Sequence, residues 1–292
     1  MPKIKIVTDS GSDISYKNED LYDIEVLPFK IALGGESYTS RVDFDNSKFY
    51  EMMDETDEVP LTSQITSFEF GELFGELFEQ GYTDVIYVGI NSEGSSTYYN
   101  SVMAKDQFLE DNPDAAGKFN IYCIDSKSYS LCYGTAVVEA AKMVNKGYEA
   151  KEIVNFLHER LEKTVAYFGL YTLKYAKKSG RIPSAAAFVG EILGVRPIMK
   201  LFDKNIETVS KVRGDASIIP AIAEQVANEI DKSLPYYIIY GNNAALSSEM
   251  TSAMTELIGY PPADSYQIGA AIAANAGPEV VGVSFVANSM MW

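Results

Sequence analysis

Asp84-Val-Ile-Tyr-Val-Gly-Ile90 is an almost uninterrupted apolar run, and Ser95-Ser-Thr-Tyr98 follows it after four residues. A short apolar run bounded by turn residues is typical of a strand buried on both faces. From Tyr98 to Leu109 the sequence predicts a helix. A second hydroxyl-rich stretch, Pro60-Leu-Thr-Ser-Gln64, precedes another predicted helix. That helix has apolar residues at helical spacing, namely Phe70, Leu73, Phe74, Leu77 and Phe78. Strand–helix units of this kind predict an α/β protein.

The hydroxyl groups of Thr62 and Ser95 are candidates for binding an anion. At the start of a helix the first N–H groups lack partners within the helix, and the macrodipole places positive partial charge there. Such a terminus suits a carboxylate or a phosphate. The alternative interpretation is that both residues only cap helices, a common role for Ser and Thr. The spacing alone leaves both interpretations open.

Strands and helices also alternate on either side of this stretch. We expect strands at 3–7, 26–33, 84–90 and 119–124, with helices beginning near Asp45, after Gln64, at Tyr98 and at Gly134. This order predicts a mostly parallel sheet with flanking helices. Polar turns at Asp9, Ser95 and Asp125 would then lie along the carboxyl edge, where ligands bind in such sheets.

The pattern changes after Gly147, and adjacent strands begin to pair. We expect helices at 150–163, 173–182, 183–193, 218–230 and 247–258, and strands at 165–171, 197–201, 206–212, 236–240 and 280–286. This order predicts a mixed or antiparallel sheet with helices. We therefore expect two α/β domains, an N-terminal one at 1–150 and a C-terminal one at 151–292.

Composition excludes several functional classes. The 292 residues carry 24 basic and 41 acidic side chains, a net charge of −17, which opposes binding to nucleic acid. The same charge disfavours lasting adhesion to an anionic membrane, so we expect only transient membrane contact. No apolar run is long enough to span a bilayer, and the first residues show no signal-peptide pattern. A cytoplasmic location with reduced cysteines is the resulting expectation.

The sequence offers no complete catalytic or metal-binding constellation. His158 is the single histidine, and it lies off the apolar face of its predicted helix. A Ser-His or Cys-His hydrolase would need it. The spacing of Cys, His, Asp and Glu fits no metal site. We therefore expect no catalytic residue, no metal and no cofactor. Two alternatives stay open: an enzyme acting on a small phosphorylated or carboxylated substrate through Asp9, Asp125 or Arg181, and a ligand sensor at the same edge.

Eight short motifs, in the same order along the chain, resemble those of the DegV family of bacterial fatty-acid-binding proteins. They are Thr8-Asp-Ser-Gly-Ser-Asp-Ile14, Thr62-Ser-Gln64, Ser95-Ser-Thr-Tyr98, Asp125-Ser-Lys-Ser-Tyr-Ser-Leu131, Lys178-Ser-Gly-Arg-Ile182, Val195-Arg-Pro-Ile198, Lys211-Val-Arg-Gly214 and Gly277-Pro-Glu-Val-Val-Gly-Val283. The resemblance implies one long-chain fatty acid in a buried tunnel, between and within two α/β domains. It also implies a non-catalytic carrier that presents the carboxylate to a separate fatty-acid kinase, as part of phospholipid metabolism.

The resemblance also assigns the headgroup site. The fatty-acid carboxylate would be bound by Thr62 and Ser95, with Ser63, Ser96 and Thr97 close to it. Two positions depart from the family pattern. Ser96 stands where the family has Gly, and Asn275 where it often has His, so we expect Asn275 at the carboxylate. Asn can donate a hydrogen bond but cannot titrate.

The resemblance further implies a docking surface for the kinase. Lys174, Lys177, Lys178 and Arg181 gather on one short segment, and Arg213 lies in a second matching motif. By the resemblance, Arg181 and Arg213 would contact the kinase. The alternative is a solvated charge run at a helix end, where cations interact favourably with the macrodipole.

Overall fold

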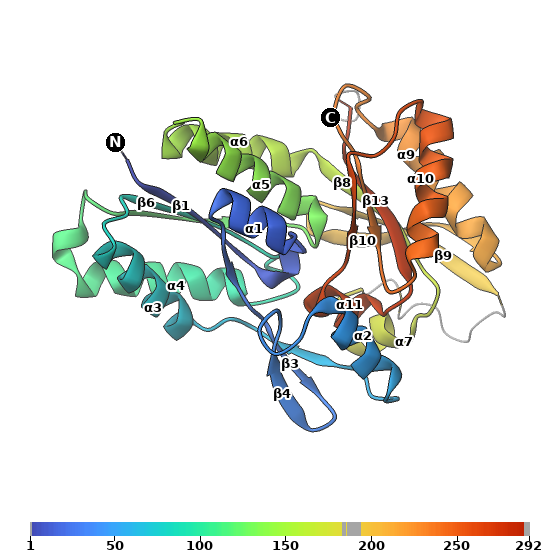
Figure 1. Ribbon diagram of the computed structural model, residues 1–292, viewed down its shortest axis with the longest axis horizontal. Helices are drawn as coiled ribbons and strands as arrows, with labels where there is room; N and C mark the ends of the chain where they lie inside the picture. Colours follow the sequence, from blue (N-terminus) through green and yellow to red (C-terminus); the bar gives the residue numbers. More distant parts are fainter. Residues whose placement is uncertain (1, 183–184, 186–193, 289–292) are drawn as a thin grey trace. The chain divides into compact units, whose positions relative to one another are not determined.

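The computed structural model describes residues 2–182, 185 and 194–288. The chain forms two compact units, each built from two segments (Figure 1). The first comprises residues 1–30 and 63–162, and the second comprises 31–62 and 163–292. This division differs from the expected boundary at residue 150 in two segments. Residues 31–62 belong to the second unit, and residues 151–162 belong to the first.

The first unit contains a four-stranded parallel sheet with the order β2-β1-β6-β7. Its strands are β1 (Ile4–Asp9), β2 (Glu25–Leu27), β6 (Asp84–Gly89) and β7 (Asn120–Asp125). Every residue of β6 is buried, as the apolar run predicts for a strand between two layers. Because the strands are parallel, the turns that follow β1, β6 and β7 meet at one edge of the sheet.

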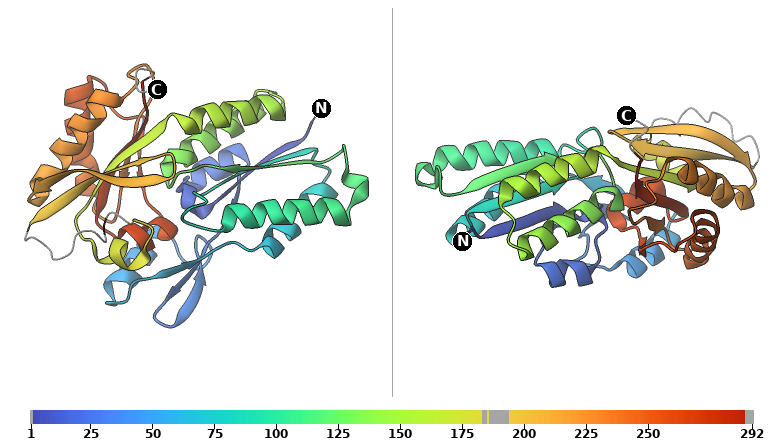
Figure 2. Two further views of the ribbon diagram at one scale, coloured as in Figure 1. Left: turned by 180° about the vertical axis from the view of Figure 1, so that it is seen from behind. Right: turned by 90° about the horizontal axis from the view of Figure 1, so that it is seen from above.

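Helices cover both faces of this sheet. They are α1 (Tyr16–Tyr22), α3 (Ser67–Glu79), α4 (Thr97–Asp111), α5 (Leu131–Asn145) and α6 (Ala150–Glu162). The pair α3 and α4 lies on one face, and α1, α5 and α6 lie on the other (Figures 1 and 2). The predicted apolar stripe of α3 is buried at Phe70, Leu73, Phe74 and Leu77. Because α6 packs against α5, residues 151–162 belong with the first unit.

The second unit contains a six-stranded sheet with the order β10-β9-β8-β13-β11-β12. Its strands are β8 (Thr164–Leu170), β9 (Val195–Phe202), β10 (Asn205–Arg213), β11 (Tyr237–Tyr240), β12 (Asp264–Gln267) and β13 (Val280–Val286). Neighbours are antiparallel except β11 and β12, which are parallel. The predicted mixed sheet is therefore confirmed, and with it the α/β fold class.

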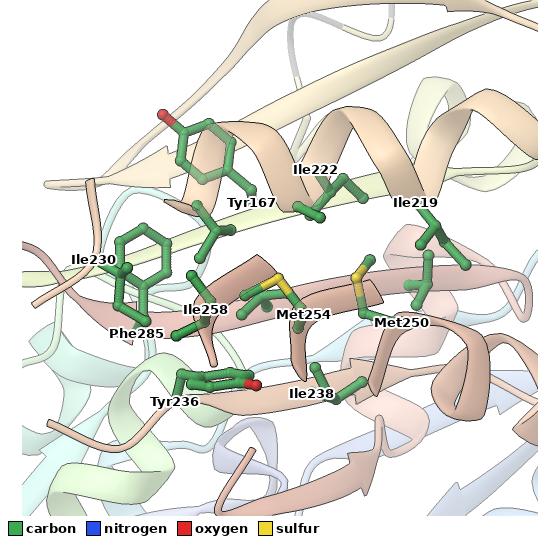
Figure 3. Packing of buried hydrophobic residues seen from close by; sticks show 14 of the residues in the cluster. Tyr167, Ile219, Ile222, Ile230, Tyr236, Ile238, Met250, Met254, Ile258 and Phe285 are labelled. Atoms are coloured by element: carbon green, nitrogen blue, oxygen red, sulfur yellow. The ribbon is translucent and has the colours of Figure 1, made fainter. Parts of the chain in front are cut away.

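One face of this sheet packs against α9 (Ile218–Glu229) and α10 (Ala244–Ile258). Figure 3 shows the side chains that fill the space between them, including Tyr167, Ile222, Met250, Met254 and Phe285. These side chains are almost completely buried, and each contributes about 1.5–3 kcal/mol by leaving water. This apolar layer holds the two helices on the sheet.

The remaining elements of the second unit include a small sheet with the order β4-β3-β5. The elements are β3 (Lys30–Leu33), β4 (Glu36–Thr39), β5 (Leu61–Ser63), α2 (Asn46–Asp54), α7 (Lys174–Ser179) and α11 (Ala270–Ala276). The Tyr50 hydroxyl on α2 donates to the Ile268 carbonyl at 2.8 Å, and Lys174 pairs with Asp57 at 3.7 Å. These contacts attach residues 31–62 to the second unit.

Several sequence predictions differ from the structure. The strand expected at 26–33 is two strands in different sheets, because the strand is interrupted at Pro28-Phe29, where Pro28 has no N–H for a ladder. Elements α1, β5, β12 and α11 were not predicted. The helix expected at 183–193 lies outside the described residues, apart from Ala185.

Candidate hydroxyl site at the start of α4

The segment 90–96 connects β6 to α4 and carries the predicted Ser95. It has no regular secondary structure, yet its backbone is tightly hydrogen bonded. The Asn91 carbonyl accepts from the N–H groups of Gly94 and Ser95, at 3.0 and 3.1 Å. The Asn91 side chain, which is 0% exposed, accepts from Glu93 N–H at 3.0 Å. These bonds fix the backbone immediately before Ser95.

Ser95 and Thr97 form a pair of hydroxyl groups at the first turn of α4. Their oxygens lie 2.9 Å apart, and the Thr97 N–H lies 3.3 Å from Ser95 Oγ. Thr97 Oγ1 also accepts from the N–H of Ile65 at 3.2 Å. Each oxygen therefore already accepts a backbone hydrogen bond. Because one hydroxyl hydrogen suffices to link the pair, the other remains available to donate to a ligand.

Three further predicted headgroup residues carry hydroxyls, namely Thr62, Ser63 and Ser96. Thr62 is half-buried in β5 and belongs to the second unit, whereas Ser63, at the end of β5, and Ser96 are exposed and belong to the first. In the described ranges none of these three hydroxyls has a protein hydrogen-bond partner. Thus the structure brings the hydroxyls of Ser95 and Thr97 into direct contact, whereas in the described residues the hydroxyls of the other three make no hydrogen bond.

The alternative interpretation of Thr62 as a helix cap is wrong. Helix α3 begins at Ser67, and its cap is Thr66, whose Oγ1 accepts from Glu69 N–H at 3.2 Å. Glu69 completes a capping box by accepting from Thr66 N–H at 2.8 Å. For Ser95 the capping interpretation holds in part, because Ser95 Oγ accepts from the first N–H of α4.

A buried carboxylate, Asp9, lies at the end of β1 and was not predicted as a structural centre. Its Oδ1 accepts from the Tyr133 hydroxyl at 2.6 Å and Gly11 N–H at 3.0 Å. Its Oδ2 accepts from the Tyr87 hydroxyl at 2.8 Å and Ile90 N–H at 2.9 Å. Complete burial raises the pKa of Asp9, and the four hydrogen bonds oppose that rise. Burial and the adjacent Asp9 also raise the pKa values of Tyr87 and Tyr133 well above the ordinary value of a tyrosine.

Asp9 is consequently a poor catalytic group. A carboxylate offers about four acceptor positions, and protein donors fill all of them here. Asp125 is similarly engaged, accepting from the N–H and the hydroxyl of Ser92 at 3.1 and 2.6 Å. His158 is exposed on α6.

The remaining predicted residues lie in the second unit. Asn275 is half-buried on α11, and its Nδ2 donates to the Ala271 carbonyl at 2.8 Å, which leaves one amide hydrogen for another acceptor. Arg181 follows α7 and is exposed, with its guanidinium donating to the Ser179 carbonyl at 2.8 Å. Arg213 is exposed at the end of β10.

Neither a metal-ion cluster nor a membrane-spanning helix occurs in the described part of the chain. No group of three or more His, Cys, Asp and Glu side chains there is arranged to hold a metal ion. None of the helices there has the length and apolar character needed to cross a membrane.

Comparison with known proteins gives matches over nearly the whole chain. The family model described as "Uncharacterised protein, DegV family" matches residues 3–288. A DegV domain-containing protein of Caldanaerobacter subterraneus is 31% identical over 287 residues, which cover 98% of this chain and 99% of that protein.

Solved structures show the same fold. DegV from Bacillus subtilis, described as a fatty acid binding protein, is 26% identical with a TM-score of 0.84, covering 99% of this chain and 100% of that one. A stearic-acid-binding protein from Eubacterium ventriosum is 23% identical with a TM-score of 0.88, again covering 99% of this chain and 100% of that one. With a family model covering residues 3–288 and a relative at 31% identity over almost its full length, this chain belongs to the DegV family.

Proposed function

We propose that this protein binds one long-chain fatty acid and presents its carboxylate to a separate fatty-acid kinase, which forms the acyl phosphate. The observation that carries the proposal is the full-length similarity to DegV of Bacillus subtilis, a fatty acid binding protein of the same fold. In this proposal the protein is a cytoplasmic carrier in phospholipid metabolism, without a cofactor or catalytic residue of its own.

The hydroxyl pair at the start of α4 supports a headgroup role. Ser95 is half-buried and Thr97 is completely buried, so the spare hydroxyl hydrogen of the pair can reach a ligand from Ser95, as a donor of the kind that a carboxylate accepts. We propose Ser95 and Thr62 as the donors to the carboxylate, with Asn275 contributing its remaining amide hydrogen. Ser63, Ser96 and Thr97 are proposed to lie close to the headgroup.

The energetics assign different tasks to the tail and the headgroup. Burying about fifteen methylene groups contributes on the order of 10 kcal/mol, at ~0.8 kcal/mol each. A hydrogen bond from a neutral donor to a carboxylate contributes only about 1.5–3 kcal/mol. The tail therefore determines most of the affinity, and the hydroxyls determine which end of the lipid is held and offset its desolvation.

An enzyme acting at the carboxyl edge of the parallel sheet is the second candidate. It would need Asp9 or Asp125 as an acid or base. Both carboxylates already accept hydrogen bonds from several protein donors, and Asp9 is fully buried. This arrangement favours a structural role for both, and therefore the carrier.

The proposed kinase contact rests on the basic segment of the second unit. Lys174, Lys177 and Lys178 on α7 and Arg181 beyond it are exposed on a protein of net charge −17. Such a local reversal of charge can steer and orient an acidic partner. We propose that Arg181 and Arg213 contact the kinase, and that membrane contact is transient.

Organic extraction of freshly purified protein followed by mass spectrometry tests the first step. We expect one fatty acid per chain, and uptake of added fatty acid by delipidated protein. Recovery of no lipid combined with no uptake would refute the proposal. Formation of acyl phosphate by a fatty-acid kinase, with and without this protein, then tests the second step separately.

A further inference from the structure

The backbone before Ser95 is held from two neighbouring strands. In the sheet order β2-β1-β6-β7, the strand β6 lies between β1 and β7. Asp9 at the end of β1 accepts from the N–H of Ile90 at 2.9 Å. Asp125 at the end of β7 accepts from the N–H and the hydroxyl of Ser92. The segment that leaves β6 is therefore fixed by one carboxylate on each side.

The Asp9 side of this arrangement is rigid. Asp9 is 0% exposed, and the hydroxyls of Tyr87 and Tyr133 hold its two oxygens from different elements. With its orientation set in this way, the carboxylate presents one oxygen to Ile90. An asparagine of the same shape would direct an NH2 group at two of the four donors, so the arrangement requires a carboxylate.

Beyond the hydrogen bonds to Asp9 and Asp125, a series of backbone hydrogen bonds continues along the chain to Ser95. The N–H of Asn91 donates to the Ser128 carbonyl at 2.9 Å, and the Asn91 carbonyl accepts from Gly94 and Ser95. Within residues 90–95 every backbone N–H has an acceptor. The position of the Ser95 backbone, from which its hydroxyl projects, is thus fixed by contacts that begin at Asp9 and Asp125.

We infer that Asp9 and Asp125 are positioning residues for recognition of the ligand's carboxylate, acting through the backbone that carries Ser95. This inference rests on the proposed function. If the hydrogen bonds to Asp9 and Asp125 hold Ser95 in place, removing either carboxylate weakens recognition of the headgroup and leaves binding of the apolar tail unchanged. A purely structural role would instead lower the melting temperature and leave the preference for a carboxylate intact.

Headgroup preference is measured as the ratio of affinities for hexadecanoic acid and 1-hexadecanol, which share a tail but differ in charge. The variants are S95A, D9N and D125A. D84N is the matched control, because Asp84 is also buried and hydrogen bonded, to Thr83 and Asn120, but lies at the opposite end of β6. Melting temperatures are recorded for all variants after delipidation.

We expect S95A to lower the acid-over-alcohol ratio about 10- to 150-fold, the equivalent of one charge-assisted hydrogen bond. D9N and D125A should lower it at least ~5-fold, with the affinity for the alcohol changed by less than about two-fold. D84N should lower the melting temperature and keep the parental ratio. Asp125 is partly exposed, so D125A decides the question if D9N does not fold.

The possible failures are distinguishable. If S95A loses the preference while D9N and D125A keep it, the positioning role is overturned and the proposed function stands. A control variant that loses the preference as strongly as D9N also overturns the inference, because the effect is then general loosening of the sheet. A parent that binds acid and alcohol equally well, or binds neither, refutes the proposed function itself.

Discussion

Replacing Thr66 by alanine should destabilise the protein, whereas replacing Thr62 should not. Thr66 Oγ1 accepts from Glu69 N–H at 3.2 Å and donates to Glu69 Oε2 at 2.7 Å. Its removal leaves a first-turn N–H of α3 without an acceptor in the protein. Thr62 lies in β5, and its hydroxyl makes no hydrogen bond within the described part of the chain. The two threonines therefore separate helix capping from ligand binding.

The magnitude follows from the surroundings of Thr66. The side chain is exposed, so water replaces part of what alanine removes. Loss of an N-cap costs about 0.5–2 kcal/mol, typically ~1 kcal/mol, in the free energy of unfolding. For a domain of roughly 150 residues this lowers the melting temperature by about 2–4 °C. Surface changes away from such features stay within about 0.5 kcal/mol, which is the expectation for T62A without ligand.

The destabilisation by T66A should depend on pH through Glu69. Partial burial alone raises the pKa of Glu69, but hydrogen bonds from Thr66 and the ammonium of Lys30 outweigh it and hold that pKa below its ordinary value of 4.5. A lowered carboxylate pKa stabilises the fold above the unfolded-state pKa, and this stability is lost as the pH falls through the folded-state value. The difference between T66A and the parent should therefore shrink below pH 4.5.

Urea unfolding of delipidated protein at pH 7 and at pH 4 measures both effects, and the ratio of hexadecanoic acid to 1-hexadecanol affinity is recorded for the same variants. We expect T66A to lose stability and keep the headgroup preference. T62A should keep its stability and lose the headgroup preference. The reasoning is refuted if T62A is the more destabilised of the two, or if T66A alone loses the preference.

Three further changes test other parts of the structure. Y50F should lower the free energy of unfolding by about 1–3 kcal/mol, because it leaves the buried Ile268 carbonyl without its donor; an unchanged urea midpoint would contradict this. G169V should cost roughly 1–3 kcal/mol or more, because a Cβ there would overlap a side chain at the start of α9, and G169A should be the milder variant. R181A/R213A should keep its fatty acid but support slower kinase-dependent phosphorylation, increasingly so with added salt. A double lysine variant of the first unit is the control, and parental rates in R181A/R213A would exclude the proposed docking.

Most of the fold could be predicted because its elements show strong periodicity. The apolar run in β6 and the stripe of α3 each indicate the element and its buried face. The elements that were not predicted correctly are short, or a residue within their sequence interrupts the regular structure. The strand expected at 26–33 is divided at Pro28, and α11 is a seven-residue helix rich in alanine with no amphipathic pattern. Residues 31–62 join the second unit through contacts such as Tyr50 with Ile268, which no local pattern indicates.

The positions of the candidate-site residues along the sheet edge could be predicted, but the hydrogen bonds among them could not. Ser95 lies at the start of a helix, and the hydroxyl-rich stretch indicates this directly. Asp9 is oriented by Tyr133, a residue 124 positions later, and Asp125 is the last residue of a different strand. Both carboxylates reach the segment after β6 because parallel strands bring the ends of β1, β6 and β7 to one edge, as expected from the sequence for Asp9, Ser95 and Asp125. The sequence therefore indicates which polar residues share this edge, whereas the hydrogen bonds that Ile90 donates to Asp9 and Ser92 donates to Asp125 emerge only from the assembled sheet.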